Sequence, residues 1–150
     1  MSKNTGNTRF RKIDVDQYSE DRYDEEDIVA EEEQGPQEAE VQALLTGGKL
    51  QDALRHVIAN APVASKNQQV KDRALKVTMK VLLSFKSVDI DQAVKSLNQD
   101  QLDVLMKYIY KGFESPSEGS SAVLLTWHEK AYSQGGMGSI VRVLTDRKKV

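Results

Sequence analysis

Cysteine is absent from this 150-residue chain, and proline, histidine and tryptophan are scarce, with three, two and one residues. Without cysteine the chain has no disulfide, no thiolate zinc site and no thiol nucleophile. No apolar run approaches the roughly 18–20 residues of a membrane-spanning helix, and the N-terminus MSKNTGNTRFRK lacks the apolar core of a signal peptide. No Asn-X-Ser/Thr acceptor occurs, and position 2 is not the glycine that myristoylation requires. We therefore expect a protein of the cell interior that has no membrane segment.

Charge of one sign dominates each part of the chain, although the net charge is only −2. Residues 1–40 carry five basic and thirteen acidic side chains, whereas residues 41–150 carry sixteen basic and ten acidic ones. This asymmetry predicts an extended acidic arm, residues 1–37, followed by a mildly basic domain, residues 38–150. The basic excess of the domain is too small and too scattered to predict nucleic-acid binding.

The arm combines acidic runs with isolated apolar side chains. Glu20–Asp27 and Glu31–Glu33 repel one another, and the sparse apolar content cannot offset the roughly 1–2 kcal/mol per residue of backbone entropy lost on ordering. We expect the arm to be disordered when unbound. Its large apolar side chains predict a short linear motif that orders on a partner, with a merely solvating tail as the alternative; they are Phe10, Ile13, Val15, Tyr18 and Tyr23.

From Glu38 onward the apolar residues follow the 3.6-residue period of helices, and no strand pattern appears. The pattern predicts an all-α domain of about seven short helices, packed as a compact bundle or a short α-solenoid. The expected helices contain residues 41–45, 50–58, 65–86, 90–97, 102–113, 121–133 and 140–144. The third has two apolar stripes, which predicts a central helix with neighbours on both sides.

Local signals predict where these helices begin and end. Ser65 opens a Ser-X-X-Gln pattern that favours a helix cap, and Asp89 is a candidate cap for the next helix. Gln134-Gly135-Gly136 is expected to separate the last two helices.

Neither histidine has the partners of a metal site. His128-Glu129 matches the start of the zinc-protease pattern H-E-x-x-H, but Tyr132 occupies the position of the second histidine. His56 has Asn60 four residues later, where a ligand would stand. We therefore expect no metal, and we expect His128 to be a partly buried helix residue with a hydrogen-bonded neighbour.

The glycine pairs do not form phosphate-binding motifs. Thr46-Gly47-Gly48-Lys49 ends like a Walker loop, but Ala43 and Leu50 occupy the positions of its first glycine and its Ser/Thr. Gly135-Gly136-Met137-Gly138 precedes a helix, so its backbone N–H groups are a candidate anion site. A tight connection between two helices is the alternative, and it explains the glycines more simply. No Gly-X-Ser-X-Gly elbow occurs either. We expect no catalysis and no cofactor.

The segment Lys107–Phe113 holds three aromatic and two lysine side chains. One interpretation is an amphipathic helix whose tyrosine hydroxyls and lysine ammonium groups reach water. The other is a protein-binding surface, since tyrosine is enriched in interfaces. Periodicity favours burial of Ile109 and Phe113, which leaves Tyr110 and Lys111 as the candidate interface residues of the domain.

Several sequence blocks together resemble one family over almost the whole chain. They are Phe10–Asp16, Lys66–Asp72, Leu105–Ser117, Trp127–Ala131 and Gly138–Leu144. In these blocks the chain is similar to subunit 5 of the actin-related protein 2/3 complex. The likeness is loosest in the acidic segment Asp21–Gln37.

The resemblance implies a non-catalytic structural subunit of the branched-actin nucleator, which nucleation-promoting factors activate. It implies that the helical domain docks on scaffold subunits and helps to hold the β-propeller subunit, and that the arm tethers actin-related protein 2. The implied arm contacts are Phe10, Arg11, Ile13, Val15 and Tyr18. ATP would belong to the actin-related subunits, in agreement with the incomplete phosphate motifs. No nucleic acid or membrane partner is implied.

The resemblance also implies a location in the cytoplasm, in the actin cytoskeleton of cell projections, with the nucleus left open as a second location. Two other classes remain alternatives: a free-standing helical adaptor that recruits ligands through its acidic tail, and an enzyme whose site one sequence does not reveal.

Overall fold

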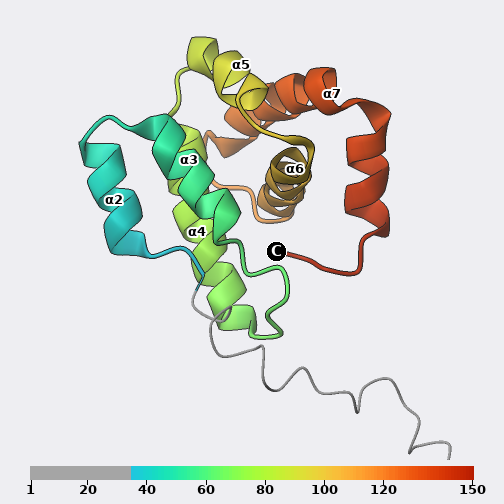
Figure 1. Cartoon of the computed structure of the whole chain (residues 1–150), viewed down its shortest axis with the longest axis horizontal. Coiled ribbons are helices and arrows are strands. Elements are labelled where there is room, and N and C mark those ends of the chain that lie inside the picture. The colour runs from blue at the N-terminus through green and yellow to red at the C-terminus, as the bar shows by residue number, and fades with distance from the viewer. Residues whose placement is uncertain (1–34) are drawn as a thin grey trace, which may run out of the picture. The chain divides into compact units, whose positions relative to one another are not determined.

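The computed structural model describes residues 35–150, and within this range the chain is entirely helical. The predicted arm contacts Phe10, Arg11, Ile13, Val15 and Tyr18 lie outside the described residues. The all-α prediction is confirmed for the domain, in which we find six helices and no strand (Figure 1). They are α2 (Glu38–Thr46), α3 (Leu50–Ala59), α4 (Gln68–Ser84), α5 (Ser87–Lys95), α6 (Gln99–Glu114) and α7 (Ser120–Thr145).

The helices form a compact bundle, one of the two predicted arrangements. Helix α4 contacts α2 and α3 as well as α6 and α7, which confirms the prediction of neighbours on both sides. Helix α6 lies near the centre of the domain and contacts α3, α4 and α7 (Figure 1). Because α7 also contacts α4 and α5, helices far apart in sequence are joined, unlike those of a linear array in which each repeat meets only its neighbours.

Two of the predicted helix caps are wrong. Helix α4 is capped by Asn67, whose side chain accepts a hydrogen bond from the Gln69 amide at 3.0 Å, while Ser65 is buried and accepts from the Asn67 amide. Helix α5 begins before Asp89, which lies in its first turn and there complements the positive end of the helix dipole. Ser65 and Asn67 are both suitable caps for α4, and periodicity alone does not distinguish them, whereas the N-cap of α5 is Lys86, whose side chain makes no capping hydrogen bond.

The last two predicted helices are the two halves of the 26-residue α7, which a kink separates, so the six labelled helices contain all seven predicted segments. The expected break is nevertheless visible as a bend at Gly136, whose φ of 68° and ψ of −170° are non-helical. At Gly135 an added Cβ atom would lie only 2.7 Å from Leu102 Cδ2, so α7 approaches α6 closely at this point. The glycines thus allow a tight connection between the two halves of α7, as the simpler interpretation predicted.

The core lies between α3, α4, α5, α6 and α7. Its largest fully buried side chains are Trp127, Tyr108, Leu54, Leu82, Ile90, Leu102, Leu105, Met106, Ile109 and Leu124. No helix among residues 35–150 has both the length and the apolar composition needed to cross a bilayer.

Tyr108 departs from the prediction that the tyrosine hydroxyls reach water. Its side chain is fully buried, and its hydroxyl has no hydrogen-bond partner of good geometry. Burial raises the pKa of Tyr108 from 10.0 to about 12, and the nearby Thr78 hydroxyl opposes this shift only in part. Because the Thr78 hydroxyl already donates its hydrogen to the Ala74 carbonyl, it does not donate to the Tyr108 phenolate oxygen and stabilises that anion little.

The buried phenol predicts an alkaline loss of stability that Tyr108→Phe removes. Because the folded chain disfavours the tyrosinate more than the unfolded chain does, this group's contribution to stability is full below about pH 10 and disappears as the pH rises towards 12. Between those values the free energy of unfolding of the native chain should fall by up to about 3 kcal/mol more than that of the variant. Urea titrations at pH 9, 10, 11 and 12 measure this difference; parallel pH curves for the two proteins would contradict the assignment.

Candidate functional site: a lysine-lined groove beside α6

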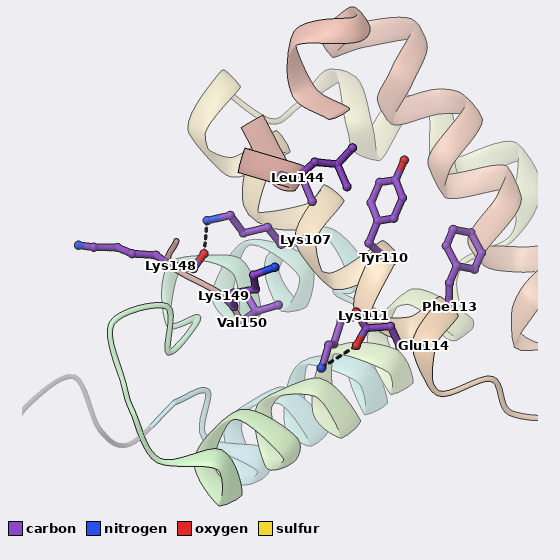
Figure 2. Close-up of a pocket in the computed structure, with 10 residues that line it drawn as sticks. Lys107, Tyr110, Lys111, Phe113, Glu114, Leu144, Lys148, Lys149 and Val150 are labelled. Carbon is purple, nitrogen blue, oxygen red and sulfur yellow. Dashed lines mark hydrogen bonds and ion pairs between the residues drawn. The ribbon is translucent and has the colours of Figure 1, made fainter. Parts of the chain in front are cut away.

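One face of α6 forms the wall of a groove with a volume of about 320 Å³ (Figure 2). Lys107, Tyr110, Lys111 and Glu114 follow one another at i, i+3, i+4 and i+7, the spacing that places side chains on one side of a helix. The opposite wall comes from the end of α7 and the residues after it. We call this the lysine groove; it is lined by Lys107, Tyr110, Lys111, Phe113, Glu114, Val143, Leu144, Lys148, Lys149 and Val150.

Lys107 holds the segment that follows α7 against α6. Its ammonium group donates to Asp146 Oδ2 at 2.5 Å and to the Lys148 carbonyl at 2.8 Å, while its side chain is only 12% exposed. The bond from Lys107, followed by the Lys148 amide, lowers the pKa of Asp146. Figure 2 shows the Lys148 carbonyl turned towards Lys107 while the Lys148 side chain extends away from it. Lys107 is therefore a structural residue of the groove.

A second pair reinforces this attachment one turn earlier on α6. Arg142 of α7 makes a two-pronged contact with Asp103 of α6, with Nε and Nη2 at 2.6 and 3.1 Å from the carboxylate oxygens. The bond to Asp103 raises the pKa of Arg142. Together with Lys107, this pair fixes the second half of α7 on α6 and keeps the groove open between them.

The remaining lysines leave the groove with an excess of positive charge. Lys111 forms an ion pair with Glu114 at 2.7 Å. Partial burial and then the nearby Lys111 charge lower the pKa of Lys71 on α4. Within residues 35–150, no carboxylate lies in ion-pairing distance of Lys71, Lys148 or Lys149.

The candidate interface residues Tyr110 and Lys111 both line the lysine groove, and both are half-buried. The Tyr110 hydroxyl lies 3.1 Å from His128 Nε2, and its ring meets the rings of Phe113 and His128 edge to face. This confirms the prediction for His128, a half-buried helix residue with a hydrogen-bonded neighbour. Tyr110 is thereby held rigidly, and its role at an interface stays a prediction.

The described residues contain no cluster of three or more side chains suited to a metal ion. His56 Nε2 lies 3.5 Å from Glu40 Oε2, too far for a good hydrogen bond, and Asn60 donates to the His56 carbonyl. Gly47 and Gly48 form the turn between α2 and α3. None of these positions assembles a nucleophile and a base.

A row of exposed apolar side chains on α7 escaped the sequence analysis. Met137, Val141 and Leu144 are 61%, 50% and 66% exposed and follow one another at i, i+4 and i+7. We call them the α7 stripe; its last member, Leu144, also lines the lysine groove. The spacing was visible in the sequence, but Ile140 and Val143 make the other face of the same segment apolar as well, so periodicity alone does not show which face is buried.

Comparison with known proteins identifies the family. A sequence model described as "ARP2/3 complex 16 kDa subunit (p16-Arc)" matches residues 9–150. Actin-related protein 2/3 complex subunit 5-C of Xenopus laevis is 55% identical over 150 residues, covering all of both chains. The chain belongs to the p16-Arc family. The human subunit 5-like protein of this family is 52% identical over the full length of both chains.

A more distant member of the p16-Arc family shows how far the likeness extends. Subunit 5 of Dictyostelium discoideum is 40% identical over 113 residues, which cover 75% of this chain and 80% of its own. The family match begins at residue 9, so it includes the predicted arm contacts from Phe10 to Tyr18. The resemblance recognised in the sequence blocks is therefore confirmed.

Proposed function

We propose that this chain is a non-catalytic structural subunit of the actin-related protein 2/3 complex, which starts branched actin filaments when a nucleation-promoting factor activates it. The observation that carries the proposal is the full-length match, at 55% identity, to a relative named as subunit 5 of that complex. In this role the chain acts in the cytoplasmic actin cytoskeleton of cell projections, with the nucleus as a second location, and it needs no cofactor of its own.

The domain and the arm have separate tasks in this proposal. The helical domain docks on scaffold subunits and helps to hold the β-propeller subunit, with Tyr110 and Lys111 as contact residues. A surface on α6 suits this task because Tyr110 is already fixed by His128 and Phe113, so docking costs little side-chain entropy.

The arm tethers actin-related protein 2 through Phe10, Arg11, Ile13, Val15 and Tyr18. A tether of this kind raises the local concentration of its binding motif near the second site, so a weak contact becomes effective. The acidic residues between position 20 and the domain serve as a spacer, because mutual repulsion keeps such a segment extended.

Deleting residues 1–36 tests the two tasks separately. We expect the shortened chain to assemble with the other subunits, because the domain begins with α2 at Glu38, and we expect the assembled complex to form fewer branches. Co-purification measures assembly, and branch counting by fluorescence microscopy measures activity.

Two matched full-length variants sharpen this experiment. Replacing Phe10 and Tyr18 with alanine should reproduce the loss of branching, whereas replacing Glu31–Glu33 with glutamine should preserve it. Normal branching by the shortened chain would refute the tether, and failure of the full chain to assemble would refute the subunit role.

A further inference from the structure

The lysine groove and the α7 stripe form one continuous surface, because Leu144 belongs to both. The stripe is apolar and exposed along the second half of α7, and the groove continues it past Leu144 to Lys148 and Lys149. Exposed apolar side chains arranged in a row at helical spacing are typical of a face that another protein covers. The groove end adds positive charge to this face.

We infer that this surface binds a segment of another subunit in which two or three apolar side chains are followed by carboxylates. The apolar part would cover Met137, Val141 and Leu144, and the carboxylates would reach Lys111, Lys148 and Lys149. The inference rests on the proposed function and deepens it, since it states the chemistry of a partner that the domain meets on docking.

Charge and shape together define this occupant. In the groove, Lys107 pairs with Asp146 and Lys111 pairs with Glu114. The ammonium groups of Lys148 and Lys149 have no carboxylate partner among residues 35–150. A partner carboxylate placed there gains a charge-assisted hydrogen bond. Nucleic acid would satisfy the lysines but leave the apolar wall of the groove and the exposed stripe without partners.

This surface is already ordered before a partner binds, so the partner can dock on it without rearranging it. Lys107 and Arg142 anchor the segment on both sides of Leu144 through Asp146 and Asp103. The partner therefore does not have to order this part of the chain, and the entropy lost on association is smaller.

Carbodiimide cross-linking of the assembled complex tests the occupant directly. This reagent adds no spacer, so it joins a lysine amine to a carboxylate only where the two groups are in contact. Mass spectrometry then identifies the two joined peptides. We expect Lys148 or Lys149 to be joined to an aspartate or glutamate of another subunit that has apolar neighbours in its sequence. Cross-links only to Glu31–Glu33 of the same chain, or none to another subunit, would overturn the inference.

Charge reversal measures the contribution of the surface to assembly. The full-length variant Leu144→Asp/Lys148→Glu/Lys149→Glu should bind the complex that lacks this subunit about tenfold more weakly or worse, as judged by fluorescence anisotropy. Its helical circular dichroism should be unchanged because all three side chains are exposed.

The matched control is Lys49→Glu/Val88→Asp. Both residues are exposed, Val88 by 81%, and neither lines the groove, so the affinity should stay within about twofold of the native value. If the native chain assembles and the groove variant binds as tightly as this control, only the inference about the groove is overturned. If the native chain itself does not assemble, the proposed function fails.

Discussion

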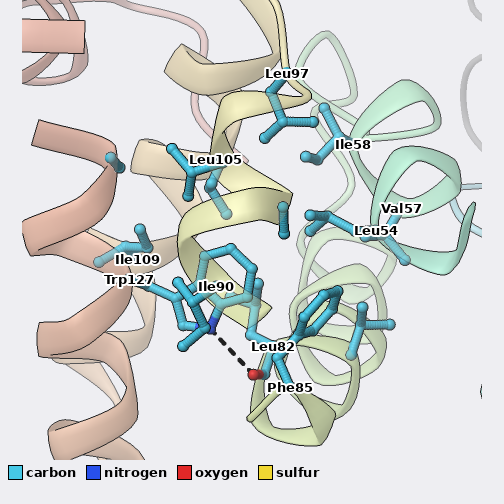
Figure 3. Close-up of a cluster of buried hydrophobic side chains, with 14 of the residues drawn as sticks. Leu54, Val57, Ile58, Leu82, Phe85, Ile90, Leu97, Leu105, Ile109 and Trp127 are labelled. Carbon is cyan, nitrogen blue, oxygen red and sulfur yellow. Dashed lines mark hydrogen bonds between the residues drawn. The ribbon is translucent and has the colours of Figure 1, made fainter. Parts of the chain in front are cut away.

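Replacing Trp127 with alanine is expected to lower the free energy of unfolding by about 3–5 kcal/mol, because it removes the largest of the fully buried side chains of this domain. The indole is fully buried between α4, α5 and α6 (Figure 3). Its ring meets Phe85 edge to face, with the ring centres 5.1 Å apart. The whole stability of a domain is typically about 5–15 kcal/mol, so the variant should be close to unfolding at physiological temperature.

The indole also satisfies a backbone group at the end of α4. Trp127 Nε1 donates to the Leu82 carbonyl at 3.1 Å. Because Leu82 lies in the last turn of α4, which ends at Ser84, its carbonyl has no partner within the helix. The Trp127 side chain thus fills the core and completes the hydrogen bonding of a neighbouring helix.

Trp127→Phe separates these two contributions. Phenylalanine keeps most of the apolar contact but leaves the Leu82 carbonyl unpaired, so the cost should be about 1–3 kcal/mol, less than for alanine. Leu125→Ala is the control, since Leu125 is 60% exposed on the same helix and should cost less than about 0.5 kcal/mol. Urea denaturation followed by circular dichroism measures all three. Equal losses for Trp127→Ala and Leu125→Ala would show that the indole does not organise the core.

Replacing Gly136 with alanine should cost about 1–3 kcal/mol, because its φ of 68° and ψ of −170° belong to a region that almost only glycine adopts. The substitution should also affect the groove. If α7 straightens to relieve the strain, the residues beyond the bend leave α6, and the pairs of Arg142 with Asp103 and of Lys107 with Asp146 are lost.

Two measurements distinguish strain from straightening. Urea denaturation gives the loss of stability, and binding to the complex that lacks this subunit reports whether the lysine groove keeps its shape. Ser133→Ala is the control: Ser133 is exposed in the same helix, so its replacement should change stability by less than about 0.5 kcal/mol. A Gly136→Ala protein as stable as this control would mean that the bend does not depend on glycine.

The helical period and the breaking residues were sufficient to predict the all-α domain and most of its helices. Val41, Leu54 and Ile90 are buried where the apolar stripes place them, and the turns fall at Gly47-Gly48 and around Pro62. These features depend on local backbone preferences and on the contrast between apolar and polar faces, both of which a single sequence contains. The charge division along the chain is also contained in the sequence, and the arm and domain drawn from it stay a prediction.

Helix caps were less well predicted because two residues near the start of α4 can accept a backbone N–H, and because the N-cap of α5, Lys86, makes no side-chain capping hydrogen bond. Asn67 competed with Ser65, and the true start of α5 preceded Asp89. The sequence did predict the glycine break in α7, which the structure has at Gly136. It did not predict that Gly135 lies close against Leu102 of α6, because that is a tertiary contact.

By itself, the sequence determined the helical class, the absence of disulfides and thiolate chemistry, and the family, because composition, periodicity and residue blocks are properties of the chain. Only the tertiary structure decided which apolar and charged residues remain on the surface. Tyr108 and Tyr110 both belong to α6, yet one is fully buried and the other lines a groove, since α4 covers the first and the segment after α7 borders the second. Likewise, Lys107 and Lys148 are distant in sequence and meet only because α7 bends back along α6.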